Sequence, residues 1–232
     1  MARFVKHTPC LSCGSRDNRA EYDDGSSYCF GCGSSSRRTR LPQGNKESDE
    51  GEYVALPKDT TTDFPPHCYQ WLTKDGLDLP TILKAGIKYT PSKDQALFPY
   101  YDRQGLLALI QARNFRKGAP KYFNIGNKED VYPIYGNLDS KTLVLCEDTL
   151  SAMKIGMVSK GMSLLGTSIS ATKLAVLGRK HQKLVVWLDR DKWREAREIA
   201  DKARWLGLST ASVFTEQDPK TYSLDKIKEL LS

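Results

Sequence analysis

Residues 183–191 read KLVVWLDRD, and this stretch decides the fold that we predict for the C-terminal part of the chain. The apolar run at 184–188 is typical of a strand that is buried on both faces, as in parallel sheets. Two acids, Asp189 and Asp191, follow where such a strand ends. The carboxyl ends of parallel strands meet at one edge of a sheet, where α/β proteins form their sites. The stretch therefore predicts a parallel sheet with an acidic edge.

The segments around this stretch alternate between strand and helix patterns. Strands are expected at 142–146, 162–165 and 210–214, and helices at 149–158, 171–177, 192–206 and 224–231. Strand–helix alternation at these lengths is typical of a parallel sheet with helices on its faces. We therefore predict an α/β fold for residues 141–232, and an α+β chain when the rest is included.

Acids follow three of the predicted strands. Glu147 follows 142–146, Asp189 and Asp191 follow 184–188, and Asp218 follows 210–214. In extended backbone, residues two apart share a face, so Asp189 and Asp191 are expected to point into one crevice. Clustered carboxylates repel one another, and magnesium or manganese with oxygen ligands relieves that repulsion. We predict a divalent metal site on Glu147, Asp189 and Asp191, with Asp218 as a further acid. Each acid alone is also typical of a helix N-cap, which is the alternative interpretation.

Four of the six cysteines form two closely spaced pairs near the N-terminus. These pairs are Cys10-Leu-Ser-Cys13 and Cys29-Phe-Gly-Cys32, with fifteen residues between them. Two such pairs are typical of a closed tetrahedral zinc site, with free thiols or an iron–sulfur site as the alternatives. Residues 1–33 are too short to fold on apolar burial alone, so we predict a zinc ribbon there. The polar residues 34–52 have the composition of a flexible linker.

Residues 53–140 form a mixed subdomain in this prediction. Short helices are expected after the two prolines at 65–66 and again at 79–85, followed by a hairpin with its turn at 102–105. The hairpin lies in a window, 103–128, that contains six basic residues and no acid: Arg103, Arg113, Arg116, Lys117, Lys121 and Lys128. We expect Trp71, Trp187 and Trp205 to lie in the core.

The overall composition limits the class of protein. The 232 residues carry a formal charge of +7, and 16 of the basic residues lie in 141–232 against 11 acids. A basic surface favours a polyanionic partner, although solubility alone also accounts for it. No apolar run is long enough to span a bilayer, which excludes an integral membrane protein, and no secretory signal is recognisable. A cytoplasmic location is therefore expected.

The order of a four-cysteine ribbon, a linker, a basic hairpin, Glu147, Asp189-Arg190-Asp191 and Asp218-Pro219 resembles the DnaG-type primases. It is most similar to the phage branch, in which a primase is fused to a replicative helicase. This resemblance covers nearly the whole chain and implies an RNA polymerase domain with an N-terminal subdomain at 53–140 and a TOPRIM catalytic subdomain at 141–232. The family pattern has Gly after the glutamate and Asp four residues after it, whereas this chain has Asp148 and Ser151.

The resemblance implies synthesis of short RNA primers on single-stranded DNA from ribonucleoside triphosphates, with magnesium or manganese. The zinc ribbon is then expected to read the template. The resemblance further implies catalytic roles for Glu147, Asp189, Asp191 and Asp218. Basic residues are expected to contact nucleotide or template, namely Lys121, Arg113, Arg116, Lys117 and Arg103.

The chain lacks the G-x-x-x-x-G-K-[ST] motif of helicase motors, so a replicative helicase is expected as a separate chain. The primase is then either free-standing or a piece of a larger protein, and Met1 favours a natural start. If the chain is phage-encoded, its location is the cytoplasm of a bacterial host. Three alternatives stay open: a TOPRIM nuclease, a recombination mediator that pairs a zinc ribbon with TOPRIM, and a zinc-ribbon DNA-binding protein whose acids only cap helices.

Overall fold

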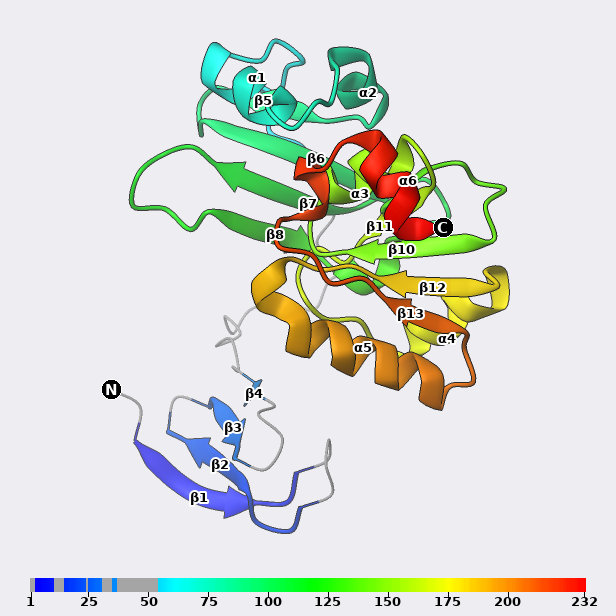
Figure 1. The fold of residues 1–232 in the computed structure, drawn as a ribbon. Coiled ribbons are helices and arrows are strands. Elements are labelled where there is room, and N and C mark those ends of the chain that lie inside the picture. Colours follow the sequence, from blue (N-terminus) through cyan, green and yellow to red (C-terminus); the bar gives the residue numbers. More distant parts are fainter. Residues whose placement is uncertain (1–2, 11–14, 24, 31–34, 37–53) are drawn as a thin grey trace. The chain divides into compact units, whose positions relative to one another are not determined.

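The computed structural model describes residues 3–10, 15–23, 25–30, 35–36 and 54–232 (Figure 1). The chain divides into two compact units, Met1–Glu50 and Gly51–Ser232. Among the described residues, the first unit is an antiparallel sheet of four short strands in the order β1-β2-β3-β4. These strands are β1 (Phe4–Thr8), β2 (Arg19–Tyr22), β3 (Ser27–Cys29) and β4 (Ser35–Ser36). Strand β4 lies within the predicted linker, and the rest of that linker is outside the described residues.

A second antiparallel sheet, in the order β5-β6-β7-β8, opens the second unit. Its strands are β5 (Lys88–Thr90), β6 (Gln95–Tyr101), β7 (Leu107–Asn114) and β8 (Tyr122–Gly126). The predicted hairpin is confirmed as β6 and β7. Its turn closes because Asp102 accepts hydrogen bonds from the backbone N–H groups of Gln104 and Leu106, both at 2.9 Å, and Gly105 takes a φ of +83°. Strand β8 was not predicted from the sequence.

The third sheet is mostly parallel, as predicted, with the order β13-β12-β10-β11-β9. Its strands are β9 (Ile134–Gly136), β10 (Thr142–Cys146), β11 (Lys160–Ser163), β12 (Lys183–Val186) and β13 (Thr210–Ser212). Strands β10 and β12 are neighbours and run parallel, so both end at the same edge. The edge strand β9 pairs antiparallel with β11 and comes from the segment predicted as the N-terminal subdomain.

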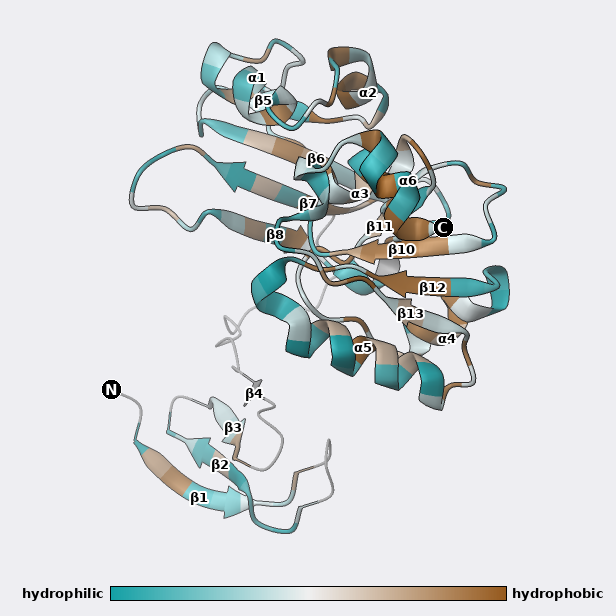
Figure 2. Ribbon diagram, viewed as in Figure 1, coloured by the Kyte–Doolittle hydropathy of each residue, from teal (hydrophilic) through white to brown (hydrophobic). Residues whose placement is uncertain are grey.

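Helices cover both faces of this sheet, as expected from the alternating pattern. They are α3 (Thr149–Gly156), α4 (Ala171–Lys180), α5 (Trp193–Trp205) and α6 (Leu224–Leu231). The short 3₁₀ turn η2 (Arg190–Lys192) lies between β12 and α5, and η3 (Pro219–Thr221) lies between β13 and α6. Leu143 and Leu145 of β10 pack in a core with α4 and α5, whereas Val144 and Cys146 pack with α3 and α6. Figure 2 shows the hydrophobic residues concentrated on β10 and β12.

Helix α3 lies between the two sheets of the second unit and packs against both of them. Its residues Leu150 and Met153 join the core of the antiparallel sheet, which also includes α1 (Pro66–Thr73) and α2 (Leu79–Lys84). The buried hydroxyls of Tyr100 and Thr149 lie 2.5 Å apart across this contact. The antiparallel sheet is thus fixed against the helix that begins directly after Glu147 and Asp148.

The predictions that Trp187 and Trp205 lie in the core have different outcomes. Trp187 is fully buried, whereas Trp205 at the end of α5 is 90% exposed, so its assignment to the core is wrong. The alternation on α5 buries Ala196, Ile199, Ala200 and Ala203 and leaves Trp205 outside that stripe. Within the described residues, every helix is too short or too polar to cross a bilayer.

Candidate active site

Two carboxylates lie at the ends of neighbouring strands, and each has an oxygen without a hydrogen-bond partner among the described residues. Glu147 follows β10 directly, and Asp189 lies three residues beyond the end of β12. The Oε2 atom of Glu147 and the Oδ1 atom of Asp189 are buried and make no hydrogen bond within the described part of the chain. A buried carboxylate oxygen without a partner is costly, because it has lost its hydration. An unpartnered carboxylate oxygen suits a divalent cation, which accepts oxygen ligands. Within the described residues, no group of three or more His, Cys, Asp and Glu side chains is arranged to hold a metal ion.

The pKa values of both acids are perturbed in the same direction. Burial raises the pKa of Glu147, and the nearby charges of Asp148 and Asp191 raise it further. Burial also raises the pKa of Asp189, to about 7, with Asp218, Asp148 and Glu147 adding to the effect. Lys220 opposes the shift at both sites. Glu147, Asp189 and Asp218 therefore belong to one electrostatic cluster, and such perturbation is typical of functional sites.

Asp148 has a different role from its neighbour. Its Oδ1 accepts hydrogen bonds from the backbone N–H groups of Leu150 (2.9 Å) and Ser151 (3.1 Å), which makes it the N-cap of α3. Its Oδ2 accepts from the Ser151 hydroxyl at 2.8 Å and from Lys220 at 2.9 Å. An ionised carboxylate has about four acceptor positions, so these contacts use its full capacity. At the two departures from the family pattern, Asp148 and Ser151 thus bond to each other.

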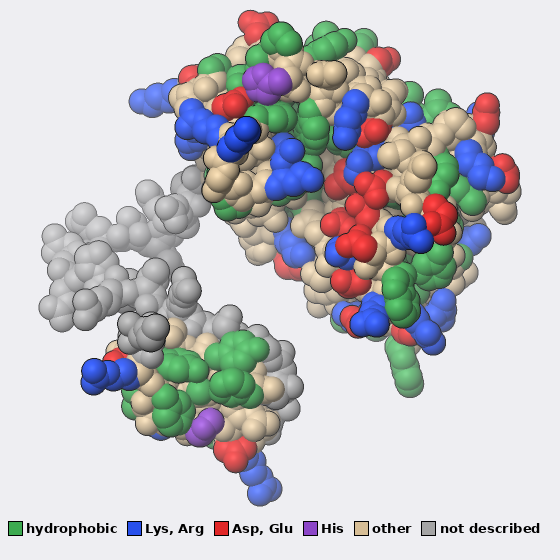
Figure 3. All heavy atoms as spheres, turned by 60° about the vertical axis from the view of Figure 1, so that its left-hand side comes forward, with side chains coloured by type: hydrophobic (Ala, Val, Ile, Leu, Met, Phe, Trp, Pro, Cys, Tyr) green, Lys and Arg blue, Asp and Glu red, His purple; other side chains and the backbone are tan. Residues whose placement is uncertain are grey.

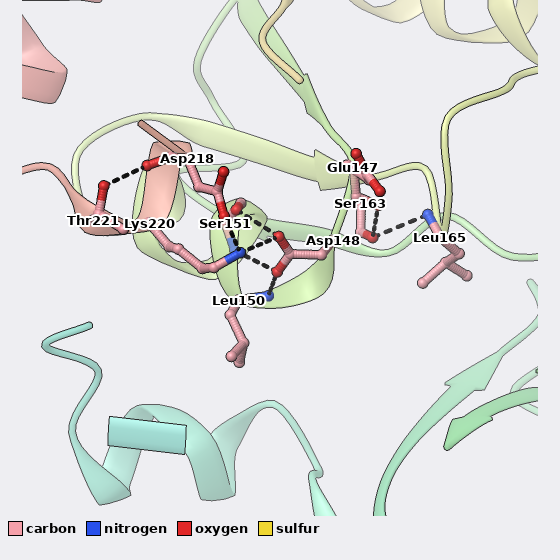
Figure 4. A network of polar contacts seen from close by, with 9 residues as sticks. All are labelled: Glu147, Asp148, Leu150, Ser151, Ser163, Leu165, Asp218, Lys220 and Thr221. Atoms are coloured by element: carbon pink, nitrogen blue, oxygen red, sulfur yellow. Dashed lines mark hydrogen bonds and ion pairs between the residues drawn. The ribbon is translucent and has the colours of Figure 1, made fainter. Parts of the chain in front are cut away.

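The Lys220 ammonium lies between two acids, as Figure 4 shows. Its Nζ is 2.9 Å from Oδ2 of Asp148 and 3.2 Å from Oδ2 of Asp218, and only 16% of its side chain is exposed. Lys220 is carried by η3, which packs against α3. The sequence analysis did not select this lysine, because its partner Asp148 lies 72 residues away along the chain.

Asp191 is arranged differently from the prediction. Residues Arg190–Lys192 form the 3₁₀ turn η2, so the backbone from Asp189 to Asp191 is not extended. The side chain of Asp191 is 72% exposed and pairs with Lys192 at 2.5 Å, which lowers its pKa. The shared-face argument for Asp189 and Asp191 is therefore wrong in its geometry. Asp191 is still close enough to Glu147 to raise that acid's pKa.

Within the described residues, none of the four predicted acids is seen to cap a helix through its side chain; the N-cap of α3 is Asp148, which was not among them. Asp189 and Asp218 stand at the N-cap positions of η2 and η3, but neither side chain makes a capping hydrogen bond. Glu147 precedes the cap of α3. Figure 3 shows acidic side chains gathered on one face of the second unit, with Lys and Arg side chains around them.

Arg113, one of the predicted basic residues, lies among aromatic side chains. Its guanidinium lies over the rings of Trp71, Phe115 and Tyr122, at 5.4, 5.6 and 5.2 Å from their centroids. The pKa of Tyr122 is raised to about 12, mainly by burial and then by Asp148, while Arg113 opposes the shift. The charges of Arg113 and of Asp148 therefore both act on the Tyr122 hydroxyl. Sequence reasoning missed this aromatic enclosure, because it is assembled from α1, β7, β8 and the residue after β7.

The other predicted basic residues have separate surroundings. Lys117 and Lys121 are exposed, and Arg116 donates a 2.5 Å hydrogen bond to the backbone carbonyl of Ser92. Arg103 lies at the turn of the hairpin, at the opposite end from Arg113, with its guanidinium 5.4 Å from the ring centroid of Tyr132. No contact in the described part of the chain joins Arg103 to the acidic cluster.

The predicted zinc ligands are only partly described. Cys10 and Cys29 are buried, with 1% and 0% exposure, and the backbone N–H of Cys10 donates to the carbonyl of Ser15 at 2.9 Å. Cys13 and Cys32 lie outside the described residues. Two buried thiols, one after β1 and one at the end of β3, are chemically suited to zinc.

Solved primase structures share the fold of this chain. The primase fragment of the bacteriophage T7 primase-helicase is 18% identical, with a TM-score of 0.54 over 99% of this chain and 98% of that one. The zinc-binding and RNA polymerase domains of the Aquifex aeolicus primase are 15% identical, with a TM-score of 0.61 over 99% and 79%. A DnaG primase catalytic domain bound to single-stranded DNA is 19% identical, with a TM-score of 0.58 over 72% and 69%. No protein-family model and no curated protein matches the sequence.

Proposed function

We propose that the chain is a DNA primase that joins ribonucleotides into short RNA primers on single-stranded DNA. The observation that carries this proposal is the pair of buried carboxylate oxygens on Glu147 and Asp189, which lack partners within the described residues. They lie at the edge of a parallel sheet in a fold that solved primases share. The fold supports the class of enzyme, and the two oxygens support a metal-dependent reaction there.

In the proposed reaction, a nucleotide 3′-hydroxyl attacks the α-phosphorus of an incoming ribonucleoside triphosphate, and pyrophosphate leaves. Glu147 and Asp189 would hold magnesium or manganese, with Asp191 as a further acid at the exposed side. A divalent cation bound there supplies positive charge for the triphosphate. The protein's own contribution is positioning and charge neutralisation, since phosphoryl transfer requires little covalent chemistry of the enzyme.

Arg113 is the residue that we propose for binding a phosphate of nucleotide or template. Its Nε is buried and makes no hydrogen bond within the described residues, so it has donor capacity for a ligand. The three rings around it hold the guanidinium in place, which reduces the entropy lost on binding. Lys121 and the exposed Arg116 and Lys117 are proposed to follow the charge of the nucleic-acid backbone. Arg103 is proposed only as a more distant contact.

The N-terminal sheet is proposed to be a structural zinc ribbon that reads the template. Its ligands in this proposal are the four cysteines Cys10, Cys13, Cys29 and Cys32. A separate replicative helicase and a cytoplasmic location belong to the same proposal. Among the similar structures, T7 primase domains interact with the T7 lagging-strand DNA polymerase on an RNA/DNA hybrid.

The test is synthesis of labelled RNA on random single-stranded DNA, with and without magnesium or manganese. Asp189→Asn is expected to abolish synthesis while retaining the circular dichroism of the wild type, and Asp225→Asn, an exposed acid on α6, serves as the matched control. Normal synthesis by the Asp189 variant contradicts the proposal. Magnesium-dependent nicking of plasmid DNA without ribonucleotides would favour the TOPRIM nuclease instead.

A further inference from the structure

The acidic cluster contains a cation of its own. Lys220 contacts Asp148 and Asp218 at 2.9 and 3.2 Å, and its side chain is only 16% exposed. It also acts on Asp189 and Glu147 through space. An ammonium group enclosed by acids in this way is unlike a surface lysine, which is solvated and contributes little to a pair.

The segment that carries Lys220 is held from both sides. The Trp187 indole donates to the Thr215 hydroxyl at 2.8 Å, and that hydroxyl donates to the Gln217 carbonyl at 2.9 Å. On the other side of η3, the Tyr222 hydroxyl accepts from the Gln217 backbone N–H at 3.2 Å. Because Trp187 is fully buried beyond β12, the position of η3 is tied to the sheet core. The ammonium is therefore preorganised between its two acids.

The acids around Lys220 form two pairs that differ in how far their oxygens are hydrogen-bonded. Asp148 has all of its acceptor positions filled, and Asp218 has one oxygen on the ammonium. Glu147 and Asp189 each retain a buried oxygen with no partner in the described residues. Asp148 and Asp218 thus share the positive charge of one ammonium, whereas Glu147 and Asp189 keep oxygens that a ligand can contact.

We propose that Lys220 takes the place of a second divalent cation, so that the protein binds one such ion, on Glu147 and Asp189. This inference rests on the proposed metal-dependent function and specifies the number of ions that the site takes from solution. A fixed ammonium supplies one positive charge at a defined position and needs no metal there. Its hydrogen bonds to Asp148 and Asp218 exclude a cation from the space between those acids.

The test counts manganese ions bound to the full chain by electron paramagnetic resonance, with manganese alone as the probe. Zinc has a filled d shell and does not enter the count. The wild type is expected to bind one manganese ion per chain, and Lys220→Met to bind two. Lys220→Arg, which keeps the charge, is expected to bind one. Lys226→Met removes an exposed lysine that pairs with Glu229 at 2.6 Å, and as the matched control it is expected to bind one ion.

Two outcomes overturn the inference. Two manganese ions on the wild type would show that Lys220 does not exclude the second ion, while primer synthesis by the same protein would leave the proposed function intact. One ion on a folded Lys220→Met variant would show that the ammonium does not set the count. If that variant does not fold, Lys220→Gln, which keeps a hydrogen-bond donor, replaces it and is expected to bind two ions. A wild type that binds no manganese contradicts both the inference and the proposed function.

Discussion

Asp189→Asn is expected to stabilise the metal-free protein while abolishing its activity. The folded protein raises the pKa of Asp189 from its ordinary value of 3.8 to about 7, mainly through burial. Each pKa unit corresponds to ~1.4 kcal/mol, so the cost of ionising this carboxyl is at most ~4 kcal/mol. Because Asp189 is only partly buried, water screens the charge, and we expect a gain of ~1–2 kcal/mol in the free energy of unfolding.

The size of the stabilisation by Asp189→Asn depends on pH. Since the folded-state pKa lies above the unfolded-state value, the folded protein binds this proton more tightly, and the wild type loses stability as pH rises from about 4 to about 7. The full cost is present above about pH 7 and absent below about pH 4. The advantage of Asp189→Asn is therefore expected to be larger at pH 8 than at pH 5.

The assay is urea-induced unfolding of wild type and variant at pH 5 and pH 8 without added divalent metal. Magnesium at about ten times its dissociation constant is expected to stabilise the wild type by ~1.4 kcal/mol and the variant by much less. The control is Asp191→Asn, because Asp191 is exposed and paired with Lys192, so little pH-dependent gain is expected. A variant of Asp189 that is less stable than the wild type at pH 8 without metal would refute the reasoning.

Three further predictions concern the residues that shape the site and the ribbon. Asp148→Ala removes the N-cap of α3 and the strongest contact of Lys220, and is expected to cost ~1–2 kcal/mol in urea unfolding; an unchanged midpoint contradicts this. Cys29→Ser is expected to lower bound zinc, measured colorimetrically, and to reduce initiation on template more than extension of a supplied primer; full zinc content argues against the ribbon. Gly161→Ala puts a methyl group 2.2 Å from the backbone carbonyl oxygen of Ala152 and is expected to destabilise by ~1–3 kcal/mol, which a thermal melt matching the wild type would disprove.

The sequence was most informative where local pattern and burial coincide. The strand at 142–146 and the helix at 224–231 have the predicted bounds, because each carries a full apolar pattern between clear turn residues. Strand β9 was missed because three residues at a sheet edge, paired antiparallel, carry no periodic signal. The exposed Trp205 was misassigned because residue type alone does not determine the direction of a side chain at a helix end.

In the candidate site, the positions of the acids could be predicted from the sequence, but the contacts of each carboxylate could not. The strand-end positions of Glu147 and Asp189 follow from the strand pattern, and both were selected. The state of each carboxylate does not follow from it, because Asp148 and Lys220 meet through a contact between distant segments. The turn at Asp191 does not follow from the strand pattern either, because the next residue, Lys192, forms an ion pair with the Asp191 side chain.

The antiparallel edge strand β9 has a consequence for dissecting the second unit. A fragment cut after residue 140 would take β9 away and leave β11 paired only with β10, with its other side unpaired along Lys160–Met162. The unpaired backbone N–H and C=O groups at this edge could then pair with another copy of the fragment, which favours aggregation over folding as a monomer. Expression of the parallel-sheet part in isolation should begin before Ile134, so that β9 stays paired with β11.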